Sequence, residues 1–252
     1  MKCAALCLIT ALLCSLPPVS YANSVEPIRV AVPDISSLLT ENQDGVYQRI
    51  MRRALQALDT EIQESFYPYK RTMLAFKYGE ADCVYSFTEV LEGQLGEEAI
   101  IASFPLGKFS YYLFALKGKA LPLSLAGLEG QQVGAVMGHE TYLDTVLDGH
   151  DIDVNWSRND ALNVAMLEHG RFDYMIAAIP DIRPHLDKLS YAPEQPLLES
   201  FDRLTCHNTE RNRAFLQALS GELRRLKGAG DYQEIAGPLY LDFDSNAVMG
   251  KR

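Results

Sequence analysis

The segments YGEADCVYSFTE (residues 78–89) and LEHGRFDYMIA (residues 167–177) share one local pattern, and this pattern decides the fold. In each, a glycine (Gly79 or Gly170) is followed three residues later by an aspartate and then by an apolar run. A glycine after a helical pattern is typical of a helix end, and such a run is typical of a buried strand. The chain is therefore predicted to repeat one helix-to-strand joint in its two halves.

Each joint completes a strand–helix–strand–helix–strand series. The first series is expected to run from a strand at residues 28–32 to a strand at residues 81–87. The second is expected to run from a strand at residues 132–136 to a strand at residues 172–179. Alternating strands and helices indicate parallel sheets with right-handed crossover connections. We therefore predict an α/β fold of two βαβαβ lobes, with the aromatic strand at residues 109–116 as the first crossing between them.

The N-terminal residues are typical of a secretory signal peptide. Lys2 precedes an apolar run that ends before Pro17, and the small residues Ser20 and Ala22 suit the positions before a cleavage site. The apolar run is too short to span a bilayer comfortably, and no later stretch of the sequence is longer. We predict a signal peptide at residues 1–22, cleavage after Ala22 and a periplasmic location.

Two cysteines lie beyond this signal, Cys83 and Cys206, each inside an apolar strand-like run. An oxidising compartment permits a disulfide between them, whereas a buried cysteine can also pack as a small hydrophobic residue. Spacing along a sequence does not fix the distance between two Cα atoms. The sequence therefore leaves both the disulfide and the two free thiols open.

The composition excludes several classes of protein. With 252 residues, 48% of them hydrophobic and 22% charged, the chain is an ordinary folded protein that can form one large domain or two small lobes. Its 33 acidic residues outnumber 23 lysines and arginines, and the net charge of −10 repels phosphate backbones, so no nucleic-acid partner is expected. The histidines have no ligand-like spacing to cysteines or acids, so we predict neither a metal nor a cofactor.

In their order and spacing, these segments resemble the bilobed periplasmic solute-binding proteins of the polar amino-acid type, the receptors of ABC importers. Besides the two joints, the resemblance is carried by three stretches: DGVYQRIMRRALQAL (44–58), LAGLEGQQVGAVMGHETY (125–142) and LKGAGDYQEI (226–235). It covers nearly all of residues 26–240.

The resemblance implies two lobes that are joined by two strands and close over a ligand held in the cleft between them. On this basis we expect residues 23–112 and 200–252 to form lobe 1 and residues 113–199 to form lobe 2. Independently of the resemblance, carboxyl ends of parallel strands and N-termini of helices converge on a crevice in such folds, where backbone N–H groups are free. The candidate site therefore lies in the segments that follow the strands.

Both halves of the usual amino-acid clamp are missing at their expected places. The family's arginine is absent from the loop expected at residues 88–96, and Ala178 stands where an acid would hold the ligand ammonium group. Both differences weaken the case for an α-amino-acid ligand. Arg71 is the candidate substitute for the arginine, and Asp181 is the nearest acid. The predicted ligand-binding residues are Arg71, Tyr85, Phe87, Thr88, Glu89, His139, Glu140, Thr141, Tyr142 and Asp181.

Three functions remain open at this point. The leading hypothesis is a monomeric, non-catalytic periplasmic receptor that captures a small polar solute, an amino acid or a related organic ion, for an ABC permease or a membrane sensor. A second is an enzyme on the same fold, similar to the cyclohexadienyl dehydratase type of hydro-lyase, with acid and base drawn from Glu89, Glu92, His139 and Glu140. A third is a ligand-free protein-interaction module.

Overall fold

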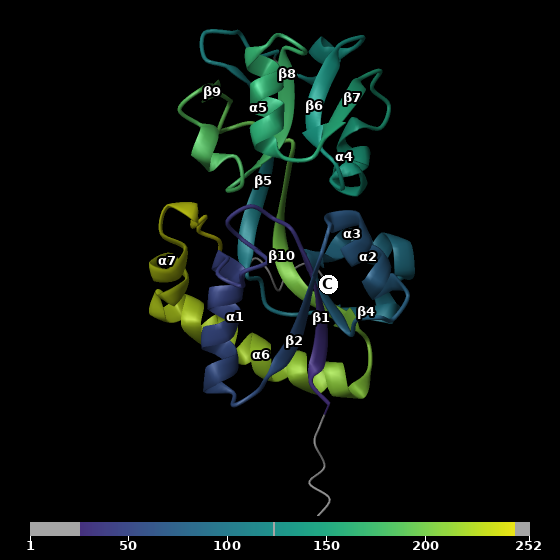
Figure 1. Cartoon of the computed structure of the whole chain (residues 1–252), viewed down its shortest axis with the longest axis vertical. Coiled ribbons are helices and arrows are strands. Elements are labelled where there is room, and N and C mark those ends of the chain that lie inside the picture. The colour runs from purple at the N-terminus through teal and green to yellow at the C-terminus, as the bar shows by residue number, and fades with distance from the viewer. Residues whose placement is uncertain (1–25, 123, 245–252) are drawn as a thin grey trace, which may run out of the picture.

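The computed structural model describes residues 26–122 and 124–244 of the chain. The predicted signal peptide, residues 1–22, and its cleavage site lie outside the described residues. Two groups of helices and strands, here called the first and second lobes, lie one above the other and are joined by two long strands (Figure 1). Within the described part of the chain, no helix is long and apolar enough to cross a membrane.

The first lobe begins with the predicted alternation of strands and helices. Its elements are β1 (Ile28–Pro33), α1 (Val46–Ala57), β2 (Ile62–Tyr67), α2 (Tyr69–Lys77), β3 (Cys83–Phe87), α3 (Thr88–Leu95), the 3₁₀ turn η1 (Glu97–Ala99) and β4 (Ile100–Ala102). Strand β1 lies between β2 and β3 and is parallel to both. The glycine after α2, Gly79, has φ +75°, which fits its predicted place at a helix end.

The second lobe repeats the alternation. Its elements are η2 (Leu125–Leu128), β6 (Gln132–Val136), α4 (Glu140–Leu147), β7 (Asp153–Ser157), α5 (Asp160–Glu168), β8 (Tyr174–Ile179), η3 (Arg183–His185) and β9 (Leu189–Ser190). Strand β6 lies between β7 and β8 and is parallel to both. Gly170, after α5, has φ +65° and so matches Gly79 in the first lobe.

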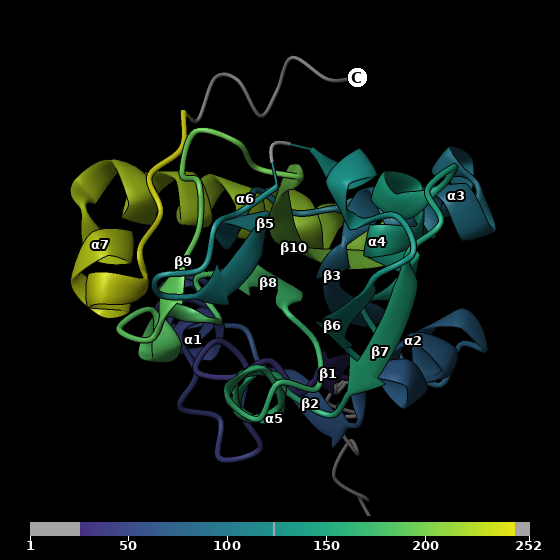
Figure 2. The same ribbon diagram turned by 90° about the horizontal axis from the view of Figure 1, so that it is seen from above.

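Two ten-residue strands, β5 (Gly107–Leu116) and β10 (Leu198–His207), join the lobes. They run antiparallel to each other, β10 pairs with β3 and β5 pairs with β8. The strand order is thus β2-β1-β3-β10-β5-β8-β6-β7. After β10 the chain returns to the first lobe through α6 (Glu210–Ala229), α7 (Asp231–Ala236) and η4 (Gly237–Leu239), which Figure 2 shows at one side of the molecule. The lobe limits at residues 112/113 and 199/200 stay a prediction.

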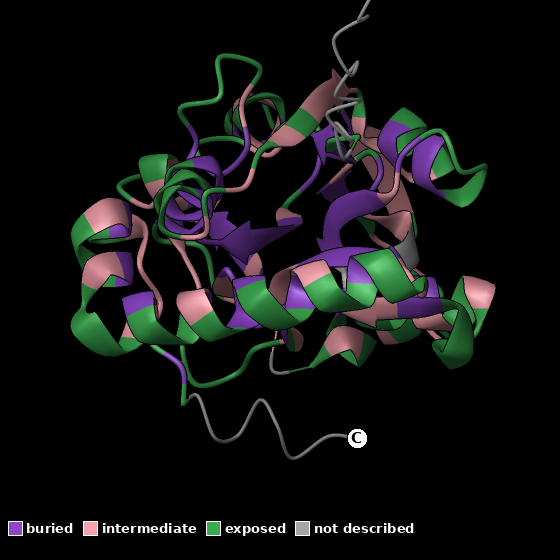
Figure 3. Cartoon of the chain, turned by 90° about the horizontal axis from the view of Figure 1, so that it is seen from below, coloured by how far each residue is buried: buried purple, intermediate pink, exposed green. Residues whose placement is uncertain are grey.

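The largest core lies in the first lobe, between the sheet and helices α1 and α6. Val46, Ile50 and Ala54 recur at a spacing of four along α1 and are buried against leucines of α6. Helix α6 begins at a side-chain cap, since the side chain of Thr209 accepts a hydrogen bond from the backbone N–H of Asn212. Figure 3 shows the result: the central strands are buried, and the outer faces of the helices are exposed. The strands at the two ends of the sheet order, β2 and β7, are only partly buried.

The loop predicted after the third strand is wrong. Helix α3 starts at Thr88, directly after β3, without an intervening loop. Leu91 is buried against the core below this helix, and the Thr88 side chain is also buried. The predicted strand at residues 81–87 also starts later, at Cys83, and the preceding Asp82 pairs its carboxylate with Arg29.

A disulfide joins Cys83 and Cys206, so the structure decides the question that the sequence left open. The two cysteines are directly opposite each other in the antiparallel pair β3–β10, and both are fully buried. The bond closes a loop with a sequence separation of 123 residues. It ties the returning strand β10 to the sheet of the first lobe.

Candidate ligand-binding site

Three polar side chains of the second lobe lie where its parallel strands end. His139 is the N-cap residue of α4, after β6, and Asp160 is the first residue of α5, after β7. Asp181 follows β8, two residues beyond Ile179. Carboxyl ends of neighbouring parallel strands meet at one edge of a sheet, so the sequence brings these three groups to the same edge.

The two joining strands and the first lobe complete this group. The hydroxyl of Tyr111, in β5, lies 2.9 Å from Nδ1 of His139. The hydroxyl of Tyr47, in α1, donates to Oδ2 of Asp202, in β10, at 2.8 Å. The charges of Asp160 and Asp202 act on Asp181, and the charges of all three aspartates act on Tyr111. We call this set the interlobe cluster; it comprises Tyr47, Tyr111, His139, Asp160, Asp181 and Asp202.

Burial dominates the electrostatics of the interlobe cluster. It raises the pKa of Asp160 to about 7 and the pKa of Asp202 to about 7. The pKa of Asp181 is raised well above its usual value by burial and then by the negative charges of Asp160 and Asp202. Burial also lowers the pKa of His139 to about 4, so its imidazole is neutral at pH 7. Among the described residues, no lysine or arginine forms a salt bridge with the three aspartates.

Two carboxylate oxygens of the cluster lack a donor. Oδ1 of Asp160 and Oδ1 of Asp181 are buried, and neither has a hydrogen-bond partner among the described residues. A buried acceptor without a donor costs about 1–3 kcal/mol, and an unpaired buried charge costs more. The cluster therefore stores unfavourable free energy that a positively charged donor group would relieve.

Aromatic rings form a wall beside the cluster. The ring of Tyr69, the first residue of α2, packs against the rings of His139 and Tyr142 at centroid distances of 5.6 and 6.1 Å. A Cβ atom on Gly138 would lie 2.7 Å from the Tyr69 ring, and Gly138 has φ +100°. Only glycine allows this close approach. The two lobes therefore touch at Tyr69.

Of the ten ligand-binding residues predicted from the sequence, the structure places some in or beside the interlobe cluster and others elsewhere. His139 and Asp181 belong to the interlobe cluster, and Tyr142 packs beside it against His139. Glu140 uses Oε2 to accept a hydrogen bond from the backbone N–H of Gly138, so it satisfies a backbone donor at the start of its own helix.

The candidates of the first lobe lie in different surroundings. Arg71 is exposed on α2, with its guanidinium group 5.5 Å from the ring centroid of Tyr67. Tyr85 is buried in the core of the first lobe, where its hydroxyl donates to Oε1 of Glu64 at 2.7 Å. Neither of these two contacts involves the interlobe cluster.

Two more candidates occupy the start of α3. The hydroxyl of Thr88 lies 2.8 Å from the hydroxyl of Thr205, in β10, and both are buried. Glu89 is exposed. Burial is the main cause that raises the pKa of Asp202, and the negative charge of Glu89 raises it further. The side chains of Phe87 and Thr141 lie outside what the structure describes.

Four members of the interlobe cluster were not predicted. Tyr47 and Tyr111 both contact the hydrophobic cores, and aromatic residues in a helix or strand are as often core as binding residues. Asp160 is the first residue of α5, where an acidic residue is common without any binding role. Asp202 offered a usable signal, because a charged residue within a strand-like run needs an explanation.

A metal site is not apparent in the described residues: no group of three or more histidine, cysteine or acidic side chains is arranged to hold a metal ion. The residues predicted as acid and base for an enzyme make unrelated contacts. Glu140 accepts a hydrogen bond from a backbone N–H, and Glu89 is exposed. Burial, and then the charge of Glu89, raises the pKa of Glu92 in α3.

No protein-family model matches the chain, and no curated protein matches it in sequence. Solved structures do match it in fold. The GluR0 ligand-binding core from Nostoc punctiforme in complex with L-glutamate superposes with a TM-score of 0.69 at 17% identity, covering 85% of this chain and 99% of the other. An ancestral arginine-binding protein bound to arginine gives 0.62 at 18% identity, covering 85% and 98%.

A third match is the amino-acid ABC transporter substrate-binding protein AbpA from Streptococcus pneumoniae, bound to L-arginine. It gives a TM-score of 0.65 at 16% identity and covers 84% of this chain and 94% of the other. At these identities the comparisons establish the fold and leave the ligand open. The chain has the α/β, type II periplasmic-binding-protein-like fold of amino-acid-binding proteins and receptor ligand-binding cores.

Proposed function

We propose that the protein is a non-catalytic binding protein that captures a small polar solute carrying an ammonium or guanidinium group at the interlobe cluster. The observation that carries this proposal is the pair of buried carboxylate oxygens, one on Asp160 and one on Asp181, without a donor among the described residues. Both lie in a cluster whose aspartates have no cationic partner there. An organic cation supplies donors and compensating charge together.

The surroundings of the cluster support a solute with an apolar body. Tyr69, Tyr111 and Tyr142 surround the neutral imidazole of His139 with ring faces and edges. Ring faces attract cations that have lost water, by about 0.5–2 kcal/mol each. We also propose that Arg71 pairs with an anionic group of the solute, if the solute carries one.

The fold supports a transport or sensing role. The similar structures are named for ligand binding: two hold arginine and one holds glutamate. We propose that this protein acts in the periplasm, after removal of residues 1–22, and delivers its solute to an ABC permease or reports it to a membrane sensor. The buried Cys83–Cys206 disulfide is compatible with an oxidising compartment.

A thermal-shift and calorimetric screen tests the proposal. The probes are L-arginine, L-lysine, agmatine and spermidine as cations, with L-glutamate and citrate as anions. A ligand at one hundred times its dissociation constant adds about 2.7 kcal/mol to the free energy of unfolding. We expect a cation to bind, and chromatography to return it unchanged.

Two variants assign the binding to the cluster. Asp181→Asn should abolish the thermal shift with the cation, because asparagine carries no negative charge. Asp187→Asn is the matched control, since Asp187 is exposed and lies only six residues further along the chain. Binding of anions alone, or a cation response that both variants retain, would contradict the proposal.

A further inference from the structure

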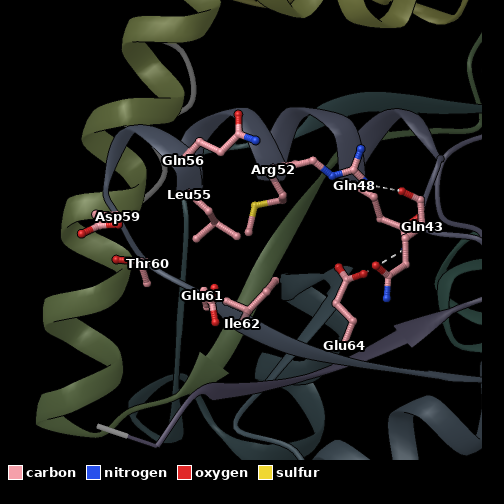
Figure 4. Close-up of a pocket in the computed structure, with 11 residues that line it drawn as sticks. Gln43, Gln48, Arg52, Leu55, Gln56, Asp59, Thr60, Glu61, Ile62 and Glu64 are labelled. Carbon is pink, nitrogen blue, oxygen red and sulfur yellow. Dashed lines mark hydrogen bonds between the residues drawn. The ribbon is translucent and has the colours of Figure 1, made fainter. Parts of the chain in front are cut away.

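A pocket lies in the first lobe, away from the interlobe cluster. It has a volume of about 430 Å³, and all its lining residues fall between Gln43 and Glu64 (Figure 4). Helix α1 forms one wall, and β2, the strand at the end of the sheet order, forms the other. Since no residue of the second lobe lines it, the pocket is independent of any contact between the lobes.

The inner wall of this α1–β2 pocket presents a carboxylate in a fixed orientation. Oε1 of Glu64 accepts a hydrogen bond from the hydroxyl of Tyr85 at 2.7 Å, and Oε2 accepts one from Nε2 of Gln48 at 3.0 Å. Tyr85 is 1% exposed and Gln48 is 4% exposed, so both donors are held by the core. The amide of Gln48 is fixed in turn by the backbone of Thr40.

Both donors to Glu64 are neutral. A carboxylate has about four acceptor positions on its two oxygens, and these two hydrogen bonds use only two of them. No lysine or arginine of the described chain forms a salt bridge with Glu64. The guanidinium group of Arg52, at the rim, instead donates to the backbone carbonyl of Gln43 at 2.6 Å. The dashed lines in Figure 4 mark this contact and the one between Gln48 and Glu64.

The remainder of the α1–β2 pocket combines an apolar wall with an acidic end. Met51, Leu55 and Ile62 line it with methylene and thioether groups, while Asp59 and Glu61 are exposed at the turn between α1 and β2. With Glu64, the lining therefore holds three carboxylates against one guanidinium group. This balance repels anions, and the apolar wall suits an aliphatic chain.

We propose that the α1–β2 pocket is a second binding site, specific for a linear aliphatic diamine. One ammonium group binds Glu64 between the donors Tyr85 and Gln48, the methylene chain lies along Met51, Leu55 and Ile62, and the other ammonium group meets the acidic turn. The volume falls within the range of about 300–1,000 Å³ that is usual for small-molecule sites. The site does not depend on the proposed function of the interlobe cluster.

Calorimetry with 1,5-diaminopentane tests this site on the purified protein. Glu64→Gln keeps the size of the side chain but removes its charge, and it should weaken binding by about tenfold or more. Glu80→Gln is the matched control, because Glu80 is an exposed carboxylate of the same lobe outside the pocket, and its affinity should equal that of the wild type. Pentylamine, which lacks the second ammonium group, should bind more weakly than the diamine.

The Asp181→Asn variant separates the two sites. If the proposal holds, this variant retains diamine binding at the α1–β2 pocket, and amide NMR signals of residues 43–64 shift on titration in both proteins. Three outcomes overturn the proposal: no binding of the diamine, equal losses in Glu64→Gln and Glu80→Gln, or loss in Asp181→Asn while Glu64→Gln binds normally. A thermal melt of Glu64→Gln confirms that the variant is folded. A negative result here leaves the cation screen at the interlobe cluster unaffected.

Discussion

The carboxyl groups at the two ends of the parallel strands have opposite pKa shifts: the pKa is lowered at the amino end of the first lobe's sheet and raised at the carboxyl ends of the second lobe's strands. At the amino end of the first lobe's sheet, Asp82 accepts hydrogen bonds from the backbone N–H of Arg29 and from its guanidinium group. Burial acts to raise the pKa of Asp82, but these hydrogen bonds outweigh it and lower the pKa below its usual value. At the carboxyl ends of the second lobe's strands, Asp160 and Asp181 each keep a buried oxygen without a donor, and their pKa values are raised.

The difference distinguishes a structural carboxylate from a binding carboxylate. Asp82 and Arg29 satisfy each other within the chain, so that pair needs nothing from outside. The aspartates of the interlobe cluster repel one another, and their unfavourable energy is relieved only by a group that the described chain does not provide. Unpaired buried polar groups are expected where a protein gives up stability for function. Four predictions test this comparison, in order of falling effect.

The largest effect is expected on affinity. Asp181→Asn should weaken binding of the cognate cation by about one hundredfold, because a charge-assisted hydrogen bond in a buried site is lost. Asp82→Asn should leave the affinity unchanged. Isothermal titration of both variants measures this directly. Equal affinities in the two variants would remove the distinction between the two ends of the strands.

The second effect is on the stability of the ligand-free protein. Folding raises the pKa of Asp160 to about 7, so its carboxyl group binds a proton more tightly in the folded state. Its stabilising contribution is therefore present below pH about 4 and is lost as the pH rises through about 7. Asp160→Asn, which cannot ionise, should be more stable than the wild type at pH 8 by about 2 kcal/mol, and the advantage should vanish at pH 4. Urea unfolding at both pH values measures this difference.

The third effect is the pH dependence of affinity. A cation binds best when Asp160 and Asp202 are ionised, and the pKa of each is raised to about 7 by burial. Affinity should thus fall as the pH falls, by about tenfold between pH 8 and pH 6 for each carboxyl group that must lose a proton. Calorimetry in buffers of different ionisation enthalpy should also detect protons released on binding at pH 7. An affinity that does not change with pH would contradict the role of these groups.

The smallest effect is expected on the free energy of unfolding, from the Arg29–Asp82 salt bridge at the amino end of the strands. Asp82→Asn removes a salt bridge whose arginine is 49% exposed, so the loss of unfolding free energy should be about 1 kcal/mol or less. Added salt should reduce the difference between variant and wild type, because solvent ions screen the pair. Thermal melts at low and high ionic strength check both statements. If the free energy of unfolding fell by several kcal/mol, the Arg29–Asp82 pair would be more than a surface ion pair.

The order of elements was predictable because it depends on local pattern. Apolar runs and the glycines that end α2 and α5 predicted five strands within two residues of their observed bounds: β1, β3, β5, β6 and β8. The position of Asp181 and His139 was also accessible, because any residue after a parallel strand lies at the edge where such folds bind ligands.

The remaining members of the interlobe cluster depend on contacts across long stretches of chain. Tyr47 and Asp202 are 155 positions apart, and nothing near either residue predicts that they share a hydrogen bond. Alternation along β3 marks Tyr85 as facing one side of the sheet but does not tell which side lies under α1. The loop expected after β3 was wrong for a related reason, since the burial of Leu91 against the core favours a helix there.

The Cys83–Cys206 disulfide also constrains how the molecule is made and how it can be taken apart. The entire second lobe lies between the two cysteines, so the bond turns residues 83–206 into a covalent ring. A ribosome makes Cys206 after every residue of that lobe, so the ring closes only once the second lobe has been synthesised. A protease that cuts the oxidised protein once within the ring leaves a single covalent molecule, which separates into two fragments only under reducing conditions.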